Sequence, residues 1–213
     1  MATTSTNPST LRKGERTRRL IVERAAPVFN QRGYAGASMS ELVAATGLEK
    51  GGIYNHFGSK EALALESFDY AVSLMADLFA EARASTDNAA DQLVAMIRAF
   101  GDSMDHPVLP GGCPLMNTAI DCDDTQPALA QHARQALTDW HRLIGSMVKA
   151  GKQQGELDPD TDPYVLASVI TSTLEGALAL SRLFDDPEHL RRAVTYLSRL
   201  VDDNRAGRRE GMS

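Results

Sequence analysis

One segment, residues 38–60, constrains the fold of this chain more than any other. Its sequence, SMSELVAATGLEKGGIYNHFGSK, has apolar residues at helical spacing on both sides of Gly47. Ser38 and Glu41 have the spacing of a capping box at the start of the first helix, and Gly47 suits the left-handed conformation that ends it. Two short helices joined by a tight glycine-containing turn form a helix-turn-helix unit, whose second helix enters the major groove of DNA.

The predicted second helix, residues 49–56, has an outer face suited to contact with DNA. Gly51 and Gly52 remove side chains where the helix would approach base edges, although each weakens the helix by about 1 kcal/mol relative to alanine. Lysines supply charge for phosphates, and tyrosine, asparagine and histidine side chains hydrogen-bond phosphates or bases. The alternative is a glycine-rich turn between two ordinary core helices. The residues predicted to bind DNA are Ser38, Lys50, Gly51, Gly52, Tyr54, Asn55, His56 and Lys60.

A larger pattern extends over residues 15–63. It consists of short motifs at fixed offsets: Ala25-Ala26-x-x-Phe29, Gly33-Tyr34, Ser38, Gly47-Leu48-x-Lys50-Gly51-Gly52-Ile53-Tyr54-Asn55-His56-Phe57 and Ser59-Lys60-Glu61-x-Leu63. This pattern resembles the N-terminal domain of the TetR family of transcriptional regulators. Glu49 departs from it, since the family more often has a small or basic residue there. A carboxylate at this position is nevertheless favourable at a helix N-terminus.

Charge is divided unevenly along the chain. The net charge of the 213 residues is −6, which is unusual for a protein that binds nucleic acid. Residues 1–60, however, have nine Lys or Arg and four Asp or Glu, a net charge of +5, which leaves −11 for residues 61–213. The attraction for phosphates is therefore expected at the N-terminal end. This division argues against an architectural protein that binds DNA non-specifically.

The sequence contains no apolar run that we expect to span a membrane and no signal-peptide pattern at its start, so we expect a cytoplasmic protein. Two cysteines in such a chain favour free thiols over a disulfide. The spacing of the cysteines and histidines fits no compact ligand pattern, so no metal is expected, and we expect no cofactor.

Apolar residues at helical spacing continue through the rest of the chain. They predict helices over residues 13–32, 59–84, 88–105, 113–120, 127–154, 163–184 and 187–203, in addition to the helix-turn-helix. The predicted fold class is therefore all-α, with a three-helix N-terminal DNA-binding head and a larger C-terminal helical body. The predicted domains are a disordered arm (1–12), a helix-turn-helix DNA-binding domain (13–60), a ligand-binding and dimerisation domain (61–204) and a flexible tail (205–213).

The last two predicted helices have the properties of a dimer interface. Both start at an Asp-Pro pair, and small residues on the first of them let another helix approach closely. Two helices from each of two subunits would form a four-helix bundle about a two-fold axis, and the family resemblance also implies dimerisation through these helices. The alternative is packing inside a single chain. The predicted interface residues are Val169, Ser172, Gly176, Ala179, Leu190, Val194 and Leu197.

The family resemblance also implies a pocket for a small inducer in the body. The candidate lining residues are Phe68, Met75, Phe100, Met104, Cys113, Met116, Trp140 and Met147. The alternative for each is simple core packing, because methionine and aromatic residues at helical spacing are usually core residues. The acidic body weakly favours a neutral or cationic ligand over an anionic one.

These observations favour a homodimeric repressor that binds a palindromic DNA operator and is released by a small-molecule inducer. One alternative is control of the same DNA binding by a reactive thiol or electrophile at Cys113. This cysteine follows two glycines and is expected to open a short helix, a position that can lower the pKa of a thiol. A small buried hydrophobe is the simpler interpretation of this cysteine. A more remote alternative is an all-helical enzyme or ligand carrier, but we find no paired carboxylates on one helix face, no His-x-x-x-His motif, no nucleophile elbow and no phosphate loop.

Overall fold

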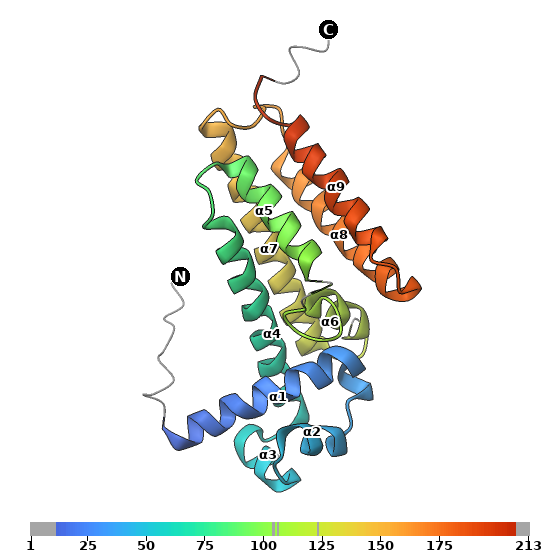
Figure 1. Cartoon of the computed structure of the whole chain (residues 1–213). Helices are drawn as coiled ribbons and strands as arrows, with labels where there is room; N and C mark the ends of the chain where they lie inside the picture. Colours follow the sequence, from blue (N-terminus) through green and yellow to red (C-terminus); the bar gives the residue numbers. More distant parts are fainter. Residues whose placement is uncertain (1–11, 104, 106, 123, 208–213) are drawn as a thin grey trace. The chain divides into compact units, whose positions relative to one another are not determined.

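The computed structural model describes residues 12–103, 105, 107–122 and 124–207, and in these residues every regular element is an α-helix (Figure 1). The all-α fold class is confirmed. Residues 1–11 of the predicted arm and 208–213 of the predicted tail lie outside the described residues. The helices are α1 (Lys13–Gly36), α2 (Met39–Thr46), α3 (Lys50–Phe57), α4 (Lys60–Arg83), α5 (Ala89–Asp102), α6 (Pro114–Cys122), α7 (Pro127–Gln153), α8 (Pro163–Phe184) and α9 (Glu188–Asp203).

The chain divides into two compact units. The first contains residues up to 71 together with residues 109–130, and the second contains residues 72–108 and the chain from 131 onward. The sequence-based prediction places a single domain boundary at residue 60, whereas each of these units is built from two separate segments of the chain. As a consequence, α6 belongs to the same unit as the helix-turn-helix.

The first unit has its apolar core where α1, α2, α3 and the start of α4 meet (Figure 1). Ile21, Leu42, Ile53 and Leu63 are each at most 1% exposed. The local signals that produce α2 are as expected: the Ser38 side chain accepts a hydrogen bond from the Glu41 amide, and the Glu41 side chain accepts one from the Ser38 amide. These contacts satisfy donors that the first turn of a helix leaves free.

The end of α1 differs from its prediction. The sequence predicts an end at residue 32, but the helical turns continue to Gly36 across a break at Gly33, where φ is 72° and ψ is 171°. The Ala37 amide then donates to the Gly33 carbonyl at 3.1 Å, which closes a further turn. Glycine adopts this positive φ without the steric cost that other residues incur, so Gly33 forms a corner within the helix instead of its end.

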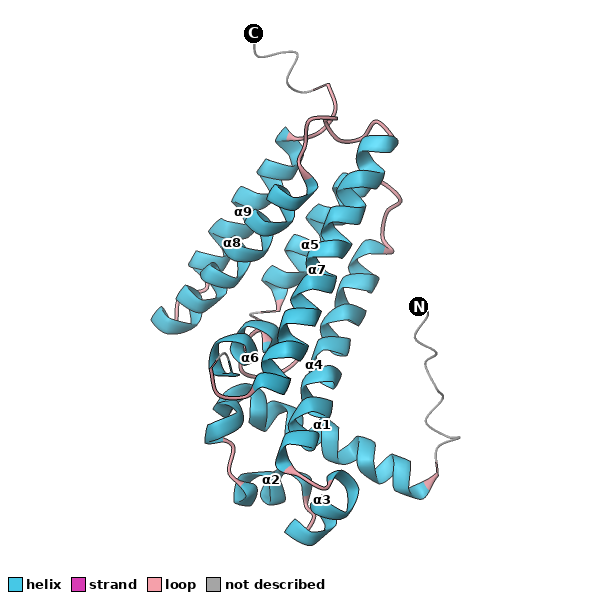
Figure 2. Cartoon of the chain, turned by 180° about the vertical axis from the view of Figure 1, so that it is seen from behind, coloured by secondary structure: helices cyan, strands magenta, loops and turns pink. Residues whose placement is uncertain are grey.

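The second unit contains α5 and α9 with α8, and α8 and α9 lie side by side in both views (Figures 1 and 2). Leu166, Ile170 and Leu174 of α8 are buried, as are Leu190 and Leu197 of α9. The corner between the two helices is closed by the Ser181 hydroxyl, which accepts a hydrogen bond from the Leu190 amide at 2.9 Å. A helical hairpin of this kind therefore uses one face of each helix inside the chain.

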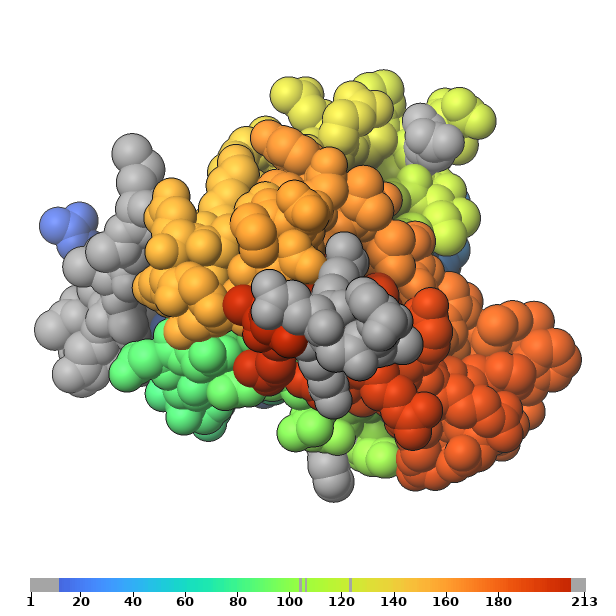
Figure 3. Space-filling model, turned by 90° about the horizontal axis from the view of Figure 1, so that it is seen from above, coloured from blue at the N-terminus to red at the C-terminus, as the bar shows by residue number. Residues whose placement is uncertain are grey.

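The connector between α7 and α8 is fastened to the end of α9. The Asp158 amide donates to the Asn204 carbonyl at 2.8 Å, and the Ala206 amide donates to the Glu156 carbonyl at 3.1 Å. In the view from above, the orange atoms of this connector lie against the red atoms at the end of α9 (Figure 3). The last described residues are thus held by backbone hydrogen bonds.

Helix α8 is long and apolar enough to cross a membrane by length and composition alone, although no such run was expected from the sequence. Half of its most apolar window is buried inside the protein. Core helices of helical proteins pass the same test, so the apolar character of α8 is explained by packing within its unit and by the exposed face described below.

Asp162 provides a prediction about acid stability. It caps α8 by accepting hydrogen bonds from the Val165 and Tyr164 amides, and these bonds lower the pKa of its carboxyl. Because the folded pKa lies below the unfolded one, the stabilisation is complete above the unfolded pKa and is lost as the pH falls through the folded pKa. Asp162→Asn keeps an acceptor without this titration. We expect urea midpoints to fall less for Asp162→Asn than for wild type between about pH 6 and about pH 3.

An equal fall in both proteins would show that the Asp162 cap has no part in the acid sensitivity. Asp160→Asn is a suitable control, because Asp160 is an exposed carboxylate two residues away in the same connector.

Candidate functional site

Helix α3 exposes one face and buries the other. Ile53 and Phe57 are 1% and 7% exposed and join the core of the first unit. Lys50, Gly51 and Asn55 are exposed. Gly52, Tyr54 and His56 are half-buried. Six of the predicted DNA-binding residues are therefore brought together on α3, which agrees with the sequence-based division into an inner and an outer face.

The two glycines of α3 are not required by the fold of the single chain. A Cβ atom added at Gly51 would meet no atom within 4 Å, and one added at Gly52 would meet the Leu48 Cβ at 3.8 Å, an ordinary contact. Neither residue has a positive φ. Glycine nevertheless weakens a helix, so its presence at both positions calls for an explanation outside the chain, such as close approach of another molecule.

Lys50 and Tyr54 form the charged and aromatic part of this face. The Lys50 ammonium lies 5.8 Å from the centre of the Tyr54 ring, within the range of a cation–π contact. Both groups also remain suited to phosphate oxygens, the lysine by its charge and the tyrosine by its hydroxyl. The pair is one helical turn apart, so the contact also orients both side chains on the same face.

Ser38 and Lys60, the other two predicted DNA-binding residues, already have partners inside the first unit. The Ser38 hydroxyl takes part in the capping box of α2. The Lys60 ammonium donates to the Tyr34 carbonyl and lies 4.5 Å from the centre of the Tyr34 ring, and burial lowers its pKa. The structure thus gives both residues a structural role, and their contact with DNA remains a prediction.

Arg18 was not among the predicted site residues, yet it fixes the end of α3. Its guanidinium donates to the His56 carbonyl, pairs with Glu66 of α4, and lies 4.2 Å from the centre of the Phe57 ring. Arginine suits this position because its planar group can stack and donate several hydrogen bonds at once. The sequence does not distinguish Arg18 from the other arginines of the N-terminal segment. The one signal is that Arg18 lies about one helical turn before the apolar residue Ile21, which the structure buries.

The predicted ligand residues are divided between the two units. Phe68, Cys113 and Met116 belong to the first. Met75, Phe100, Trp140 and Met147 belong to the second, and Met104 lies outside the described residues. The predicted residues are therefore not brought together as one described pocket within a single unit.

Trp140 has the most specific surroundings among these residues. Its indole Nε1 donates to the Thr171 hydroxyl at 3.0 Å, and its ring centre lies 4.2 Å from that of Phe79. The Thr171 hydroxyl in turn donates to the Ala167 carbonyl. An aromatic pair with a satisfied indole is typical of a well-packed interior, and it also provides an apolar wall with one polar group.

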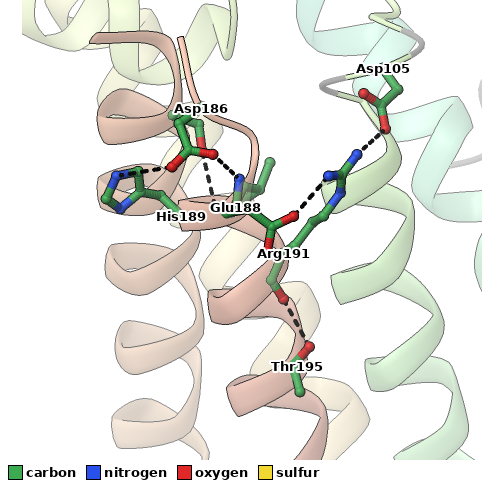
Figure 4. Close-up of polar contacts among 8 residues, drawn as sticks. Asp105, Asp186, Glu188, His189, Arg191 and Thr195 are labelled. Carbon is green, nitrogen blue, oxygen red and sulfur yellow. Dashed lines mark hydrogen bonds and ion pairs between the residues drawn. The ribbon is translucent and has the colours of Figure 1, made fainter. Parts of the chain in front are cut away.

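Two surface grooves in the second unit are lined by other residues. One, of about 290 Å³, lies between α5 and α9 and has Leu190 and Val194 along it. At its edge Arg191 donates to Glu188 at 2.9 Å and lies 3.5 Å from Asp105 (Figure 4). The other, of about 300 Å³, lies between α4 and α5. None of the predicted ligand residues lines either groove.

Both cysteines are buried free thiols, at 5% exposure for Cys113 and 1% for Cys122. Burial, together with the charge and hydrogen bond of Asp121, raises the pKa of Cys122 to about 11. The thiolate is the reactive form of cysteine. Because the raised pKa keeps Cys122 protonated near neutral pH, we expect this thiol to be unreactive in the folded protein. The free-thiol prediction agrees with these positions.

This burial predicts the result of thiol titration. We expect the native protein to react slowly with an aromatic disulfide reagent near pH 8, and both thiols to react rapidly after unfolding in guanidinium. Cys113→Ser and Cys122→Ser identify which thiol is responsible for any fast phase. A fast native reaction that disappears in Cys122→Ser would contradict the raised pKa, and one that disappears in Cys113→Ser would favour the thiol-sensor alternative.

The predicted interface residues fall into two groups. Leu190 and Leu197 are 1% and 0% exposed, because α9 packs against both α5 and α8, so they belong to the core of the unit and not to its surface. Ser172, Gly176 and Ala179 of α8 are exposed, and Val169 and Val194 are half-buried.

The exposed residues of α8 continue into an apolar stripe. Val165 is 59% exposed, Leu180 is 43%, Leu183 is 75% and Phe184 is 62%. Together with Val169, Ser172, Gly176 and Ala179 they follow helical spacing along one side of the helix. We call these eight residues the α8 stripe. A contiguous exposed apolar surface of this kind is typical of an interaction site.

Comparison with known proteins agrees with this architecture. A family model described as "Bacterial regulatory proteins, tetR family" matches residues 21–66, and one described as "Tetracyclin repressor-like, C-terminal domain" matches residues 89–197. A TetR transcriptional regulator from Chloroflexus aurantiacus is 42% identical and superposes with a TM-score of 0.88 over 92% of this chain and 98% of its own.

Two further relatives are more distant. The transcriptional repressor DhaR of a Mycobacterium species is 22% identical over 84% of this chain and 89% of its own length. The regulator CifR, a cysteine mutant solved with a 26-bp operator duplex, shares the fold at 23% identity and a TM-score of 0.76, over 85% of this chain and 94% of its own. The matched families and relatives are transcriptional regulators and not enzymes.

Proposed function

Because this chain belongs to the TetR family of transcriptional regulators, we propose that it is a homodimeric repressor of transcription that an inducer releases from its operator. The observation that carries the DNA-binding part is the glycine pair of α3, Gly51 and Gly52, which the fold of the single chain does not require. Because these two positions of α3 have no side chains, the helix backbone can approach base edges closely. We therefore place the operator contact at Lys50, Gly51, Gly52, Tyr54, Asn55 and His56.

Two copies of this helix are needed to read a palindrome. In a symmetric dimer, two recognition helices would enter successive major grooves about 34–36 Å apart. The α8 stripe supports this arrangement, because its small residues in the middle and large apolar residues at one end suit a second copy of the same helix about a two-fold axis. A repressor of this kind acts where the chromosome is, so we propose a cytoplasmic location.

Control by a ligand follows from linkage. An inducer that weakens operator binding must bind the DNA-free conformation more tightly than the DNA-bound one. In the second unit, the Trp140 and Phe79 rings with the Thr171 hydroxyl have the apolar character and single polar group of a ligand wall. We propose an apolar, neutral or cationic inducer, which suits the acid-rich composition of the chain beyond residue 60. The alternative of control through Cys113 is less favoured, because this thiol is buried.

Selection of a duplex from a random pool tests the proposal without knowledge of the regulated genes. We expect the wild-type protein to enrich an inverted repeat, and Lys50→Ala with Tyr54→Ala to lose most of its affinity for that sequence. Each lost phosphate contact also lowers the dependence of affinity on salt. A folded dimer that enriches no sequence would contradict the proposal.

A further inference from the structure

The contacts between α6 and α1 suggest a further role for α6. Both helices belong to the first unit, although their interacting residues are more than 80 positions apart in the chain. The contacts are hydrogen bonds to backbone groups at the end of α1, directly before the Ser38 cap of α2. The end of α1 therefore forms the entrance to the helix-turn-helix.

Asp121 of α6 holds the corner at Gly33. Its Oδ2 accepts a hydrogen bond of 2.7 Å from the Tyr34 amide. A Cβ atom at Gly33 would lie 2.7–2.8 Å from the carboxylate, closer than real Cβ contacts. Glycine is thus required twice at this position, first for its positive φ and second for the room that the carboxylate occupies.

Tyr34 connects this carboxylate to the far end of the helix-turn-helix. Its amide donates to Asp121, and its carbonyl accepts a hydrogen bond from the Lys60 ammonium at the start of α4. Lys60 follows the Gly58 cap of α3 by two residues. The backbone of a single residue therefore bridges α6 and the segment that follows the recognition helix.

A second set of hydrogen bonds lies one turn earlier in α1. The Asn117 side chain of α6 donates to the Asn30 carbonyl at 3.2 Å and to the Gly111 carbonyl at 2.8 Å. The Asn30 side chain donates to the carbonyls of Pro110 and Gly112 at 2.9 and 3.0 Å. These contacts fix the loop before α6 to the same end of α1. Together they form a network whose members restrain one another.

We propose that Asp121, supported by Asn117, is a positioning residue for DNA binding: it fixes the Gly33–Tyr34 corner and thereby holds the helix-turn-helix in the orientation that reads the operator. This inference rests on the proposed function. Without the carboxylate, the Tyr34 amide loses its partner and the corner gains freedom, so the conformation competent for specific binding is less populated. Apparent affinity falls with the fraction of that conformation.

The test compares Asp121→Ala, Asp121→Asn and the control Asp124→Ala, which removes an exposed carboxylate from the turn after α6. The probe is the duplex enriched by the wild-type protein, with a scrambled duplex alongside. We expect Asp121→Ala to bind the enriched duplex about tenfold more weakly, since it loses a charge-assisted hydrogen bond. Asp121→Asn retains most of the affinity because its amide oxygen still accepts from Tyr34. Binding of the scrambled duplex is expected to stay the same in all proteins.

Hydrogen exchange at the Tyr34 amide gives a readout that general damage would not reproduce: exchange is faster in Asp121→Ala and restored in Asp121→Asn. Wild-type affinity in Asp121→Ala would overturn the inference and leave the proposed function intact. Equal loss of specific and non-specific binding, or a loss that Asn does not restore, would also overturn it. If the wild-type protein enriches no duplex, the proposed function fails and this inference fails with it.

Discussion

Gly51→Glu is expected to abolish specific DNA binding and to leave the fold intact. A side chain at Gly51 meets nothing in the chain, and a carboxylate near the start of a helix is favourable to it. On DNA, the same group would occupy the space of the approaching duplex and repel its phosphates. We expect an affinity loss of about 100-fold or more for the enriched duplex, measured by fluorescence anisotropy, with an unchanged or raised melting temperature.

Comparison of Gly51→Ala with Gly51→Glu separates the effect of side-chain volume on DNA binding from the effect of negative charge. We expect Gly51→Ala to raise the free energy of unfolding by up to about 1 kcal/mol, because alanine is the better helix former, and still to weaken specific binding. Gln131→Glu, at an exposed position of α7, adds a negative charge to the other unit and is expected to change neither property. An affinity equal to wild type in Gly51→Glu would show that α3 does not face the DNA.

Gly176→Arg is expected to convert the proposed dimer into a monomer. A Cβ atom at Gly176 meets nothing within 4 Å, so the single chain accommodates a larger side chain. In a dimer that packs two α8 stripes together, however, the arginine would be buried without a partner, which is strongly unfavourable. We expect the dimer dissociation constant to rise by about 100-fold or more, measured by sedimentation velocity across a concentration series.

Loss of the dimer also affects DNA binding. A monomer presents one recognition helix, so it loses the gain in affinity that comes from linking two sites. Gln131→Arg introduces the same side chain on exposed α7 and is expected to leave the dimer unchanged. A Gly176→Arg protein that remains a dimer at low concentration would remove the α8 stripe from the proposed interface.

The elements of the fold were predictable because their signals are local. Ser38 with Glu41, Gly47 and Asp162 each determine a helix end through contacts with residues a few positions away, and the structure has these caps where the sequence predicts them. The division of α3 into a buried and an exposed face is also local, since it depends only on the order of residues along one short helix.

The contacts that the sequence did not reveal join distant segments. Asp121 meets Tyr34 across 87 positions, and Arg18 meets Glu66 across 48. Neither pair has a spacing that marks it in a sequence. For the same reason Leu190 and Leu197 were assigned to the interface: an amphipathic helix shows that it has a buried face, but not whether its own chain or a second copy covers that face.

Protection of guanine N7 from methylation on the enriched duplex tests the central claim most directly, because N7 is exposed only in the major groove. If α3 from each subunit reads the bases, the wild-type protein protects guanines in two symmetric clusters separated by about one helical turn, and Gly51→Glu protects neither. Protection of a single cluster, or binding that leaves every guanine N7 open to methylation, would contradict the account.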